Sequence, residues 1–455
     1  MTSVSRIHDN LLGDAEVANQ FSAHNQLQAM LDVESALAEA EALIGVIPSS
    51  CVEPIKAAAR AELYNCNQLA VETTEAGNPV IPVVHHLTET VSRSSPAAAR
   101  YVHWGATSQD ILDTSLVLQL RAAVTIILTQ LERSVETSAY LAERFADSTM
   151  PGRTWLQQAT PITFGLKAAG WADALNRTRL QVNRTLDGVL VLQFGGASGT
   201  LASLGSQGLA TTDALAASLK LRAPAIPWHA NRDRFSQLGC ALGVATGAIG
   251  KIARDLTLLS QTEVAEANEQ PVEGRGGSST MPQKRNPVGA SVALAAACRA
   301  PGLVATLLAA MVQEHERAVG GWQAEWDTLP DLVIASSGGA GAIADTLERL
   351  TVHTDQMRTN LEISKGTLLA ESIAMALADS IGKHEAHICV ANACRRAASE
   401  NRTLLEVLTD EPLVTRHLDP TKIAQLLTPD RYLGASRQFI QRVLDSIRVP
   451  ISADD

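Results

Sequence analysis

A glycine-rich segment of this sequence gathers several groups that could act on a bound substrate. It spans residues 273–287, and its second part reads Gly-Gly-Ser-Ser-Thr-Met-Pro-Gln-Lys-Arg-Asn-Pro. The glycines leave the backbone free to adopt positive φ angles, to move, or to approach a ligand closely. The two adjacent serine hydroxyls offer a proton carrier, and Lys284 and Asn286 offer donors for an anion. A flexible linker is the alternative, but linkers seldom continue directly into Met-Pro-x-Lys-x-Asn.

Three further segments combine polar side chains with an expected helix end. Residues 103–114 contain Gly-Ala-Thr-Ser-x-Asp, residues 152–161 contain Gly-Arg-Thr-Trp-Leu-Gln-Gln-Ala, and residues 314–326 contain Gly-Gly-Trp-Gln-Ala-Glu-Trp. Their structural alternatives are an ordinary helix N-terminus, a polar loop before a helix, and a solvated helix end with packed indoles. As a site, a helix start with free N–H groups and two hydroxyls would suit a carboxylate. The residue pattern alone leaves both interpretations open for each segment.

The composition indicates a large helical protein that does not bind nucleic acid. A chain of 455 residues is long enough for about three domains, and Ala and Leu, which favour helix, take the place of its scarce aromatic residues. The formal net charge is −11, without a basic run, which argues against nucleic acid or an anionic membrane surface as a partner. An acidic protein that binds an anionic substrate therefore needs a local cationic pocket.

The cysteines and the N-terminus indicate a reduced intracellular protein. The six cysteines are scattered, without a Cys-x-x-Cys pair or a zinc spacing, so we expect reduced core residues and no metal site. The N-terminal segment lacks the apolar core of a signal peptide, and no uninterrupted apolar run approaches the roughly 18–20 residues that span a bilayer. We therefore expect a soluble cytoplasmic protein without a membrane partner.

Helical periodicity dominates the elements that must position these groups. An apolar seam alternates steps of three and four, at Phe235, Leu238, Leu242, Ala245, Ile249, Ile252, Leu256 and Leu259. A seam of this length predicts one long helix of a bundle. A second long helix is expected over about residues 112–145. A third is expected to begin after Asn286-Pro287 and to be kinked or interrupted at Pro301-Gly302.

The distribution of prolines and long helices suggests three regions. Residues 1–110 hold shorter helices that prolines interrupt, residues 111–355 hold the long helices, and residues 356–455 form a smaller helical piece. A Rossmann nucleotide site is disfavoured, because the Gly-Gly-Ala-Ser-Gly segment at residues 195–199 follows no clear strand-to-helix unit. The predicted fold class is therefore all-α.

Three segments resemble, in their order and spacing, the three signature regions of the fumarase/aspartase superfamily. In chain order they are Gly-Ala-Thr-Ser-x-Asp, Gly-Arg-Thr-x-x-Gln-x-Ala and the glycine loop. The resemblance covers nearly the whole chain. Residues 30–34, 76–82 and 320–326 make it most similar to the adenylosuccinate-lyase-like branch, and there to the bacterial carboxymuconate cycloisomerases. The resemblance implies three helical domains and a homotetramer in which the long central helices of four subunits form one bundle. It also implies that each active site is shared among three subunits.

The resemblance also implies roles for single residues. The residues that we assign to catalysis are Ser278, Lys284 and His103. Ser278 matches the catalytic base, Lys284 is the nearby lysine that favours its alkoxide, and His103 matches a family histidine near the site that binds substrate or orients a hydroxyl. The positions that we assign to substrate binding are Thr107, Ser108, Thr154, Gln157, Ser279, Met281, Asn286 and Arg317. Arg317 and Lys284 would supply the cationic pocket. For His85 and His86 a structural role is as well founded as a role in the site.

One position departs from the family pattern. Adenylosuccinate lyases and fumarases have a histidine after Arg-Thr that is thought to protonate the leaving group, but this chain has Trp155 there. An indole N–H does not titrate, so Trp155 cannot deliver that proton. A cycloisomerase does not need it, because its nucleophile is a substrate carboxylate that is already ionised at pH 7.

The departure favours cofactor-free intramolecular lactonisation of a small polycarboxylate, with Ser278 delivering a proton to the carbon beside a carboxylate. The resemblance implies that this reaction belongs to aromatic catabolism. Two alternatives stay open. The first is adenylosuccinate lyase or another β-eliminating lyase of the superfamily. The second is a noncatalytic helical scaffold that retains the fold, although a scaffold has no need for a serine, a lysine and an asparagine together in one loop.

Overall fold

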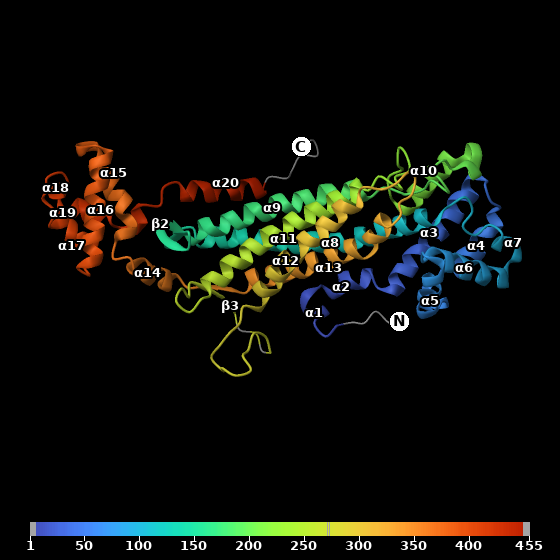
Figure 1. The fold of residues 1–455 in the computed structure, drawn as a ribbon, viewed down its shortest axis with the longest axis horizontal. Coiled ribbons are helices and arrows are strands. Elements are labelled where there is room, and N and C mark those ends of the chain that lie inside the picture. The colour runs from blue at the N-terminus through green and yellow to red at the C-terminus, as the bar shows by residue number, and fades with distance from the viewer. Residues whose placement is uncertain (1–5, 271, 273, 449–455) are drawn as a thin grey trace. The chain divides into compact units, whose positions relative to one another are not determined.

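Helices make up most of the protein. The structure is a computed structural model that describes residues 6–270, 272 and 274–448 (Figure 1). Two short antiparallel strand pairs are the only sheets among these residues, so the predicted all-α class is confirmed. The extreme N-terminal residues and Glu273, which entered the predictions about targeting and about the loop, lie outside the described residues.

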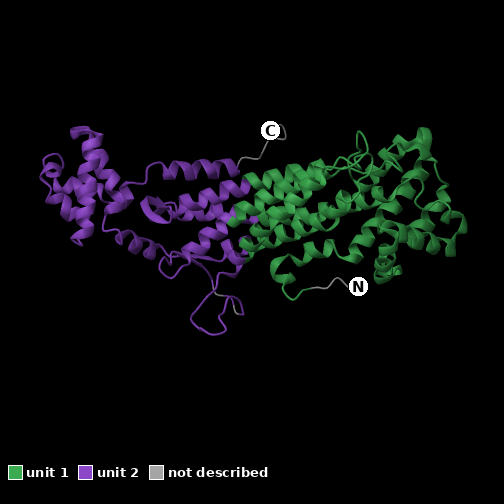
Figure 2. Cartoon of the chain, in the orientation of Figure 1, with its two compact units in different colours: residues 1–131, 177–250, 292–342 green, residues 132–176, 251–291, 343–455 purple. Residues whose placement is uncertain are grey.

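Two compact units divide the chain (Figure 2). Unit 1 consists of residues 1–131, 177–250 and 292–342, and unit 2 of residues 132–176, 251–291 and 343–455. The five longest described helices each contribute residues to both units, namely α8 (Ser108–Arg144), α9 (Phe164–Val189), α11 (Asp233–Leu259), α12 (Val288–Ala310) and α13 (Gly321–Glu348). The region of long helices that the sequence predicts is thus divided between the two units.

The three predicted long helices exist. The apolar seam lies on α11, and all of its side chains from Phe235 to Leu259 are buried. α8 covers the second predicted helix and starts at Ser108, slightly earlier than expected. α12 begins directly after Pro287, as predicted, but it continues through Pro301 to Ala310. The expected interruption at Pro301 therefore does not occur.

Shorter helices form the rest of unit 1. α3 (Ala23–Ile44) packs against α4 (Val52–Ala58) and α10 (Gly208–Leu219). Its N-terminus is capped by the side chain of Ser22, and it ends at Gly45, whose φ is 81°. The remaining α-helices are α1 (Asp9–Leu12), α2 (Ala15–Gln20), α5 (Cys66–Ala76), α6 (Val80–Ser94) and α7 (Pro96–Ala99), with 3-10 turns at Ser49–Cys51, Ala61–Leu63 and Ala202–Gln207.

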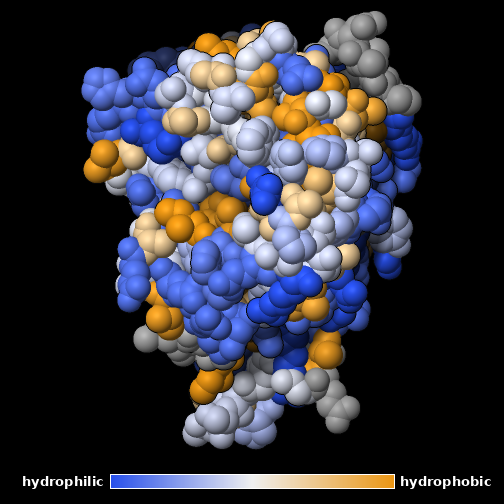
Figure 3. Space-filling view, turned by 90° about the vertical axis from the view of Figure 1, so that its right-hand side faces the viewer, coloured by the Kyte–Doolittle hydropathy of each residue, from blue (hydrophilic) through white to orange (hydrophobic). Residues whose placement is uncertain are grey.

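The surface of unit 1 is mixed in polarity. Figure 3 shows the face at the right-hand side of Figure 1, where hydrophobic spots alternate with hydrophilic residues. The exposed large apolar side chains of this unit include Leu43, Leu63, Val71, Ile81 and Leu209. Apolar residues scattered in this way are normal for a folded protein and indicate no particular binding surface.

Unit 2 holds both strand pairs. β1 (Thr149–Thr154) pairs with β2 (Gln157–Thr163), and β3 (Ala267–Glu269) pairs with β4 (Leu350–Val352). The sequence prediction missed these strands. The C-terminal part contains α14 (Thr354–Glu362), α15 (Ala370–Ile381), α16 (Lys383–Ser399), α17 (Leu404–Thr409), α18 (Pro412–Thr415), α19 (Pro420–Leu426) and α20 (Ser436–Arg448), with 3-10 turns at Thr367–Leu369 and Pro429–Arg431. α15 and α16 pack against α17 and α19 around a core of Leu, Ile, Val and Ala side chains.

Candidate active site

The glycine loop is closed at its neck and open beyond it. The N–H of Asn286 donates to the carbonyl of Gly276 at 2.8 Å, and Gly277 and Arg285 form an antiparallel bridge. Gly276 has a φ of 74°, and a Cβ there would lie 2.8 Å from the carbonyl oxygen of Asn286. Gly277 has neither restriction. Of these two residues, only Gly276 therefore needs to be a glycine in this conformation.

The hydroxyl of Ser278 lies in a turn of backbone N–H groups. Its Oγ accepts hydrogen bonds from the N–H of Met281 at 2.9 Å and of Thr280 at 3.3 Å. Two N–H dipoles that point at one oxygen stabilise negative charge on it. Ser279, Met281 and Lys284 extend from the same loop with exposed side chains. This loop can thus present a polarised hydroxyl, and it also carries an exposed lysine.

Asn286 and Glu269 fix the far end of the loop. The side-chain amide of Asn286 donates to the carbonyl of Gly277 at 3.4 Å. The carboxylate of Glu269 accepts the N–H groups of Gly289 and Ala290, at 3.2 and 2.9 Å, and so caps the first turn of α12. The loop therefore passes directly into an anchored helix.

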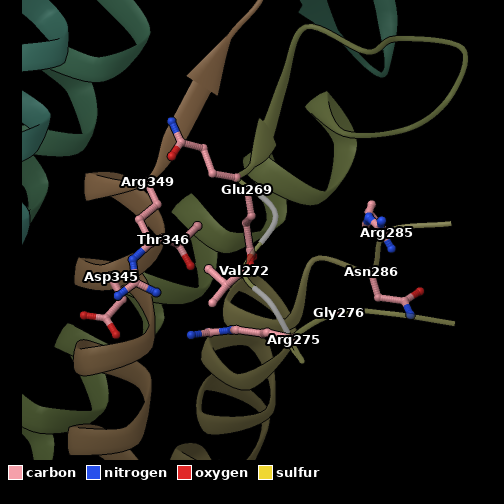
Figure 4. A pocket seen from close by; sticks show the side chains of 10 residues that line it. Glu269, Val272, Arg275, Gly276, Arg285, Asn286, Asp345, Thr346 and Arg349 are labelled. Carbon is pink, nitrogen blue, oxygen red and sulfur yellow. The ribbon is translucent and has the colours of Figure 1, made fainter. Parts of the chain in front are cut away.

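A small cavity lies beneath the loop (Figure 4). Its volume is about 20 Å³, which is room for one water molecule and too little for a polycarboxylate. Figure 4 shows the Arg275 side chain reaching from the loop toward Asp345 and Arg349. We conclude that the side chains around this cavity support the loop and that the cavity does not bind the substrate.

The segment that contains Gly-Arg-Thr-x-x-Gln-x-Ala, residues 152–161, lies in a β-hairpin. Thr154 and Gln157 face each other as the last pair of β1 and β2, and Trp155 and Leu156 form the tip. Both tip residues have positive φ, 52° and 63°, and they are 97% and 78% exposed. The polar loop that was the structural alternative for this segment is therefore wrong. The hairpin holds Thr154 and Gln157 side by side at the surface.

An ion pair holds this hairpin in place. The guanidinium of Arg153 binds the buried carboxylate of Glu266 through two hydrogen bonds of 2.8 and 2.7 Å. The amide of Asn360 donates to the same carboxylate at 2.8 Å. Paired hydrogen bonds of this kind fix geometry as well as charge, so Arg153 holds the hairpin in place.

The first turn of α8 is fixed by a buried carboxylate. Asp110 accepts the N–H groups of Thr107, Gly195 and Gly196 at 2.9–3.0 Å and lies 2.7 Å from Nε2 of His229. Its lone pairs are thus committed to the protein. Thr107 and the neighbouring Ser108, which starts the helix, remain half-exposed.

A second buried network lies one turn further along α8. The guanidinium of Arg232 is enclosed by Asp113, at 2.6 and 2.9 Å, and by Glu325, at 2.6–3.1 Å. The indole N–H of Trp322 also donates to Asp113, and Trp322 and Trp326 pack edge to face with ring centroids 5.1 Å apart. The packed indoles expected for residues 314–326 are present, but Glu325 is buried and not solvated.

Arg317 lies beside the start of α8 with one donor unused. Its Nε donates to Gln109 at 3.0 Å and its Nη1 to the carbonyl of Ala197 at 3.1 Å. Its Nη2 is buried and has no hydrogen-bond partner among the described residues. Gln109 is itself held by Asp113 and by the carbonyl of His229. The structure thus leaves one oriented guanidinium N–H of Arg317 without a partner in the described part of the chain.

The predicted site residues fall into two groups. Unit 1 contains His103, Thr107, Ser108 and Arg317, which lie around the start of α8. Unit 2 contains the hairpin pair and the loop residues, and no hydrogen bond or ion pair joins the hairpin to the loop in the described part of the chain. His85 and His86 lie elsewhere, on α6: His85 is 3.6 Å from Glu89 of the same helix, and His86 is 2.8 Å from Glu72 of α5. In residues 6–270, 272 and 274–448, no three His, Cys, Asp or Glu side chains gather as metal ligands.

The sequence prediction missed several supporting residues. Arg232 carried no signal, because its partners are 93 and 119 positions away in the sequence. Glu34 stood in a segment that contributed to the resemblance, but nothing there pointed to its partner His103, 69 positions away. Asp110 stood inside a quoted motif, where the pattern of a helix start could have identified it as a cap. Glu34 lies 2.5 Å from Nδ1 of His103.

Comparison with known proteins identifies the family of this chain. A family model described as "Lyase" matches residues 14–302, and one described as "Adenylosuccinate lyase C-terminus" matches residues 366–443. The 3-carboxy-cis,cis-muconate cycloisomerase of Bradyrhizobium diazoefficiens is 48% identical over 98% of this chain and 99% of its own length. The protein of the same name from Pseudomonas aeruginosa is 50% identical over 93% of this chain and 92% of its own.

A solved structure shows the same relationship in three dimensions. The crystal structure of the 3-carboxy-cis,cis-muconate lactonizing enzyme from Pseudomonas putida is 44% identical and matches with a TM-score of 0.92, over 97% of this chain and 98% of that one. Likeness of this extent covers both units and every signature region. The chain therefore belongs to the lyase family, the fumarase/aspartase superfamily that its motifs predict.

Proposed function

We propose that this chain is a cycloisomerase that closes 3-carboxy-cis,cis-muconate into a carboxymuconolactone, in the catabolism of aromatic compounds and without a cofactor. Relatives of 48% and 50% identity that bear this activity in their names support the proposal. The observation that carries the mechanism is the setting of Ser278, whose Oγ receives two backbone N–H groups. A serine so placed can lose its proton and be regenerated.

In the proposed reaction, a substrate carboxylate oxygen bonds to one carbon of a double bond. The displaced electron pair moves to the neighbouring carbon, next to a second carboxylate, where negative charge develops. The Ser278 hydroxyl gives its proton to that carbon, and the alkoxide that remains takes a proton from solvent. Ring closure within one bound molecule gains from proximity. The N–H groups of Thr280 and Met281, with Lys284, stabilise the alkoxide in the meantime.

The exposed hairpin tip distinguishes this reaction from amine release. An eliminating lyase needs an acid for its leaving group, and the residue at that place is Trp155, which cannot titrate. In lactonisation the attacking oxygen is already ionised and loses no proton. Trp155 therefore favours the cycloisomerase over adenylosuccinate lyase or another β-eliminating lyase.

We assign substrate recognition to groups that can bind carboxylates. The free Nη2 of Arg317 and the half-exposed first turn of α8, with Thr107 and Ser108, form the fixed part of this set. The residues that complete it are Thr154, Gln157, Ser279, Met281 and Asn286. Together with Lys284, Arg317 supplies the positive charge that a protein of net charge −11 must provide locally.

We further propose a soluble, cytoplasmic homotetramer whose active sites each draw on three subunits. Two helices, α8 and α12, are long and apolar enough to cross a membrane, but 61% of the most apolar stretch of α8 is buried within the chain. In α12 that share is only 28%, and Arg299 is its single charged residue. An apolar surface of this size needs a cover, and in this family we infer that other copies of the chain supply it. The domain division at residues 1–110, 111–355 and 356–455 is part of the same proposal.

The decisive experiment identifies the product. Purified protein is incubated with 3-carboxy-cis,cis-muconate in D₂O, and the product is analysed by mass spectrometry and NMR. We expect a lactone with one deuterium on the saturated carbon next to a carboxylate, because the proton carried by Ser278 exchanges with solvent. Unchanged carboxymuconate together with cleavage of adenylosuccinate, offered in a parallel incubation, would contradict the proposal.

A further inference from the structure

The buried side of α3 carries a carboxylate that the mechanism above does not use. Glu34 is 2% exposed, and its Oε1 lies 2.5 Å from Nδ1 of His103. Burying a carboxylate is costly unless it is paired, and this pair joins segments 69 positions apart. Glu34 ends the Met-Leu-Asp-Val-Glu segment that contributed to the family resemblance and to which no chemistry was assigned.

The backbone of His103 is held in an unusual conformation. Its φ is 57°, in the left-handed region that non-glycine residues rarely adopt. Strain of this kind persists only where the surroundings enforce it, and it concentrates at functional sites. In this conformation Nδ1 faces Glu34, whereas Nε2 has no hydrogen-bond partner in the described part of the chain. The His103 side chain is 18% exposed, so a ligand can reach that second nitrogen.

Nearby carboxylates set the charge of the His103 ring. Burial alone would lower the pKa of His103, but the attraction and hydrogen bond of Glu34, with a contribution from Asp110, raise that pKa above its ordinary value. Asp110 is shared with His229 and with backbone N–H groups. Glu41, two turns along α3, is fully buried without partners, and burial and the charge of Glu34 raise its pKa to about 9. Glu41 is therefore uncharged at neutral pH, which leaves Glu34 as the carboxylate that governs the ring.

We propose that Glu34 is a positioning residue for His103. By accepting the Nδ1–H hydrogen bond, Glu34 orients the ring and favours its imidazolium form, whose Nε2–H donates to a substrate carboxylate beside the first turn of α8. The inference rests on the proposed function, because it takes the ligand to be a polycarboxylate. Proton transfer to carbon stays with Ser278. If the pair were only structural, its loss would change stability but leave the pH dependence of turnover unchanged.

The test compares two glutamates of the same helix in the assembled, full-length protein. Steady-state kcat and KM for 3-carboxy-cis,cis-muconate are measured as a function of pH for Glu34→Gln and Glu41→Gln. Glu34→Gln keeps the shape but removes the charge, so the pKa of His103 falls. As the pH rises, activity that needs the imidazolium then begins to fall at a lower pH than in the unsubstituted enzyme. We expect the alkaline limb of kcat/KM to move down by about one pH unit, with an about tenfold loss on that limb that lies mainly in KM.

Glu41→Gln is the matched control, because the carboxyl that it replaces carries no charge over most of this range. It should keep the alkaline limb of the unsubstituted enzyme. Glu34→Asp retains the charge at a longer distance and should give an intermediate limb. A wild-type pH profile in Glu34→Gln would overturn the inference. If Glu34→Gln does not assemble, Glu34→Asp decides in the same way, since an unchanged profile there contradicts the role.

A double variant tests whether Glu34 acts through His103. Combined with His103→Asn, Glu34→Gln should cause no further loss of kcat/KM, whereas additive losses would contradict the proposal. The proposed function and this inference can be refuted separately. An unsubstituted enzyme that leaves carboxymuconate unchanged refutes the proposed function and this inference with it. An active enzyme whose pH profile does not change when Glu34 is replaced refutes the inference alone.

Discussion

The first turn of α8 and the loop at residues 274–286 carry the two parts of the proposed chemistry, and they are held in opposite ways. At α8, Asp110 accepts three backbone N–H groups, and Arg232 is 2% exposed between two carboxylates. In the loop, hydrogen bonds close the neck between Gly276 and Asn286, and beyond it the lysine and the second serine are exposed. In the proposed mechanism, the fixed part of substrate recognition is thus built on a rigid base, whereas proton transfer depends on an exposed loop.

This division has a physical reason. Donors that recognise an anion work best when they are oriented before the anion arrives, because no free energy is then spent on ordering them. A serine that must become an alkoxide works best when water is excluded, which requires a segment that closes over bound substrate. The contrast between the two regions therefore predicts different consequences when each is damaged.

The largest effect is expected from the loop, in Ser278→Ala. Removing the proton carrier should lower kcat by about 10²–10⁴-fold, the usual range for general acid–base groups, without loss of folding, because Ser278 is only half-buried. The rate of lactone formation and a circular dichroism spectrum measure both outcomes. Ser279→Ala, one residue on, removes only a substrate contact and should cost less. Near-normal turnover by Ser278→Ala would remove the loop from the chemistry.

Damage to the buried network around Arg232 should instead lower the stability of the protein. Arg232→Met leaves Asp113 and Glu325 facing each other without a cation, which should destabilise the protein by about 3–5 kcal/mol. Thermal unfolding of the purified variant measures it. Lys56→Met breaks an ion pair on the surface, with Glu39, and should melt close to the unsubstituted protein. Equal melting of the two variants would mean that the network does not hold α8 rigidly.

The parts of the fold that the sequence predicted are those with a local pattern. The seam of α11 repeats every three or four residues, and each of those positions is buried, so period and burial carry the same information. β1 and β2 lacked such a pattern, since they contain Pro151 and Pro161 and show little alternation. Their hairpin depends on Arg153 and its partner Glu266, more than a hundred positions away, which no local pattern encodes.

The same distinction applies to the site. The sequence brought out groups that face a ligand, such as the loop hydroxyls and the first turn of α8, because reactive groups cluster in short motifs. Those assignments stay predictions. The supporting roles of the buried carboxylates and of Arg232 escaped, since those roles depend on partners far away in the sequence. Gly276 and Gly277 looked equivalent in the sequence, and only the backbone conformation separates them.

That pair of glycines gives the smallest and most specific prediction. Gly276→Ala places a side chain at φ 74° and against the carbonyl of Asn286, so it should strain the neck by about 1–2 kcal/mol and lower kcat/KM by roughly 5–30-fold. Gly277→Ala meets nothing within 4 Å and should keep kcat/KM within about twofold of the unsubstituted enzyme.

Steady-state kinetics on both glycine variants decide between two descriptions of the loop. A loss confined to Gly276→Ala means that the neck keeps its conformation during turnover and that closure occurs beyond it, among residues 278–284. An equal loss in Gly277→Ala means that this residue must adopt a positive φ in the closed state, because nothing in the present conformation obstructs an alanine there. The hinge would then include the neck itself, and the rigid part of the site would end at α12.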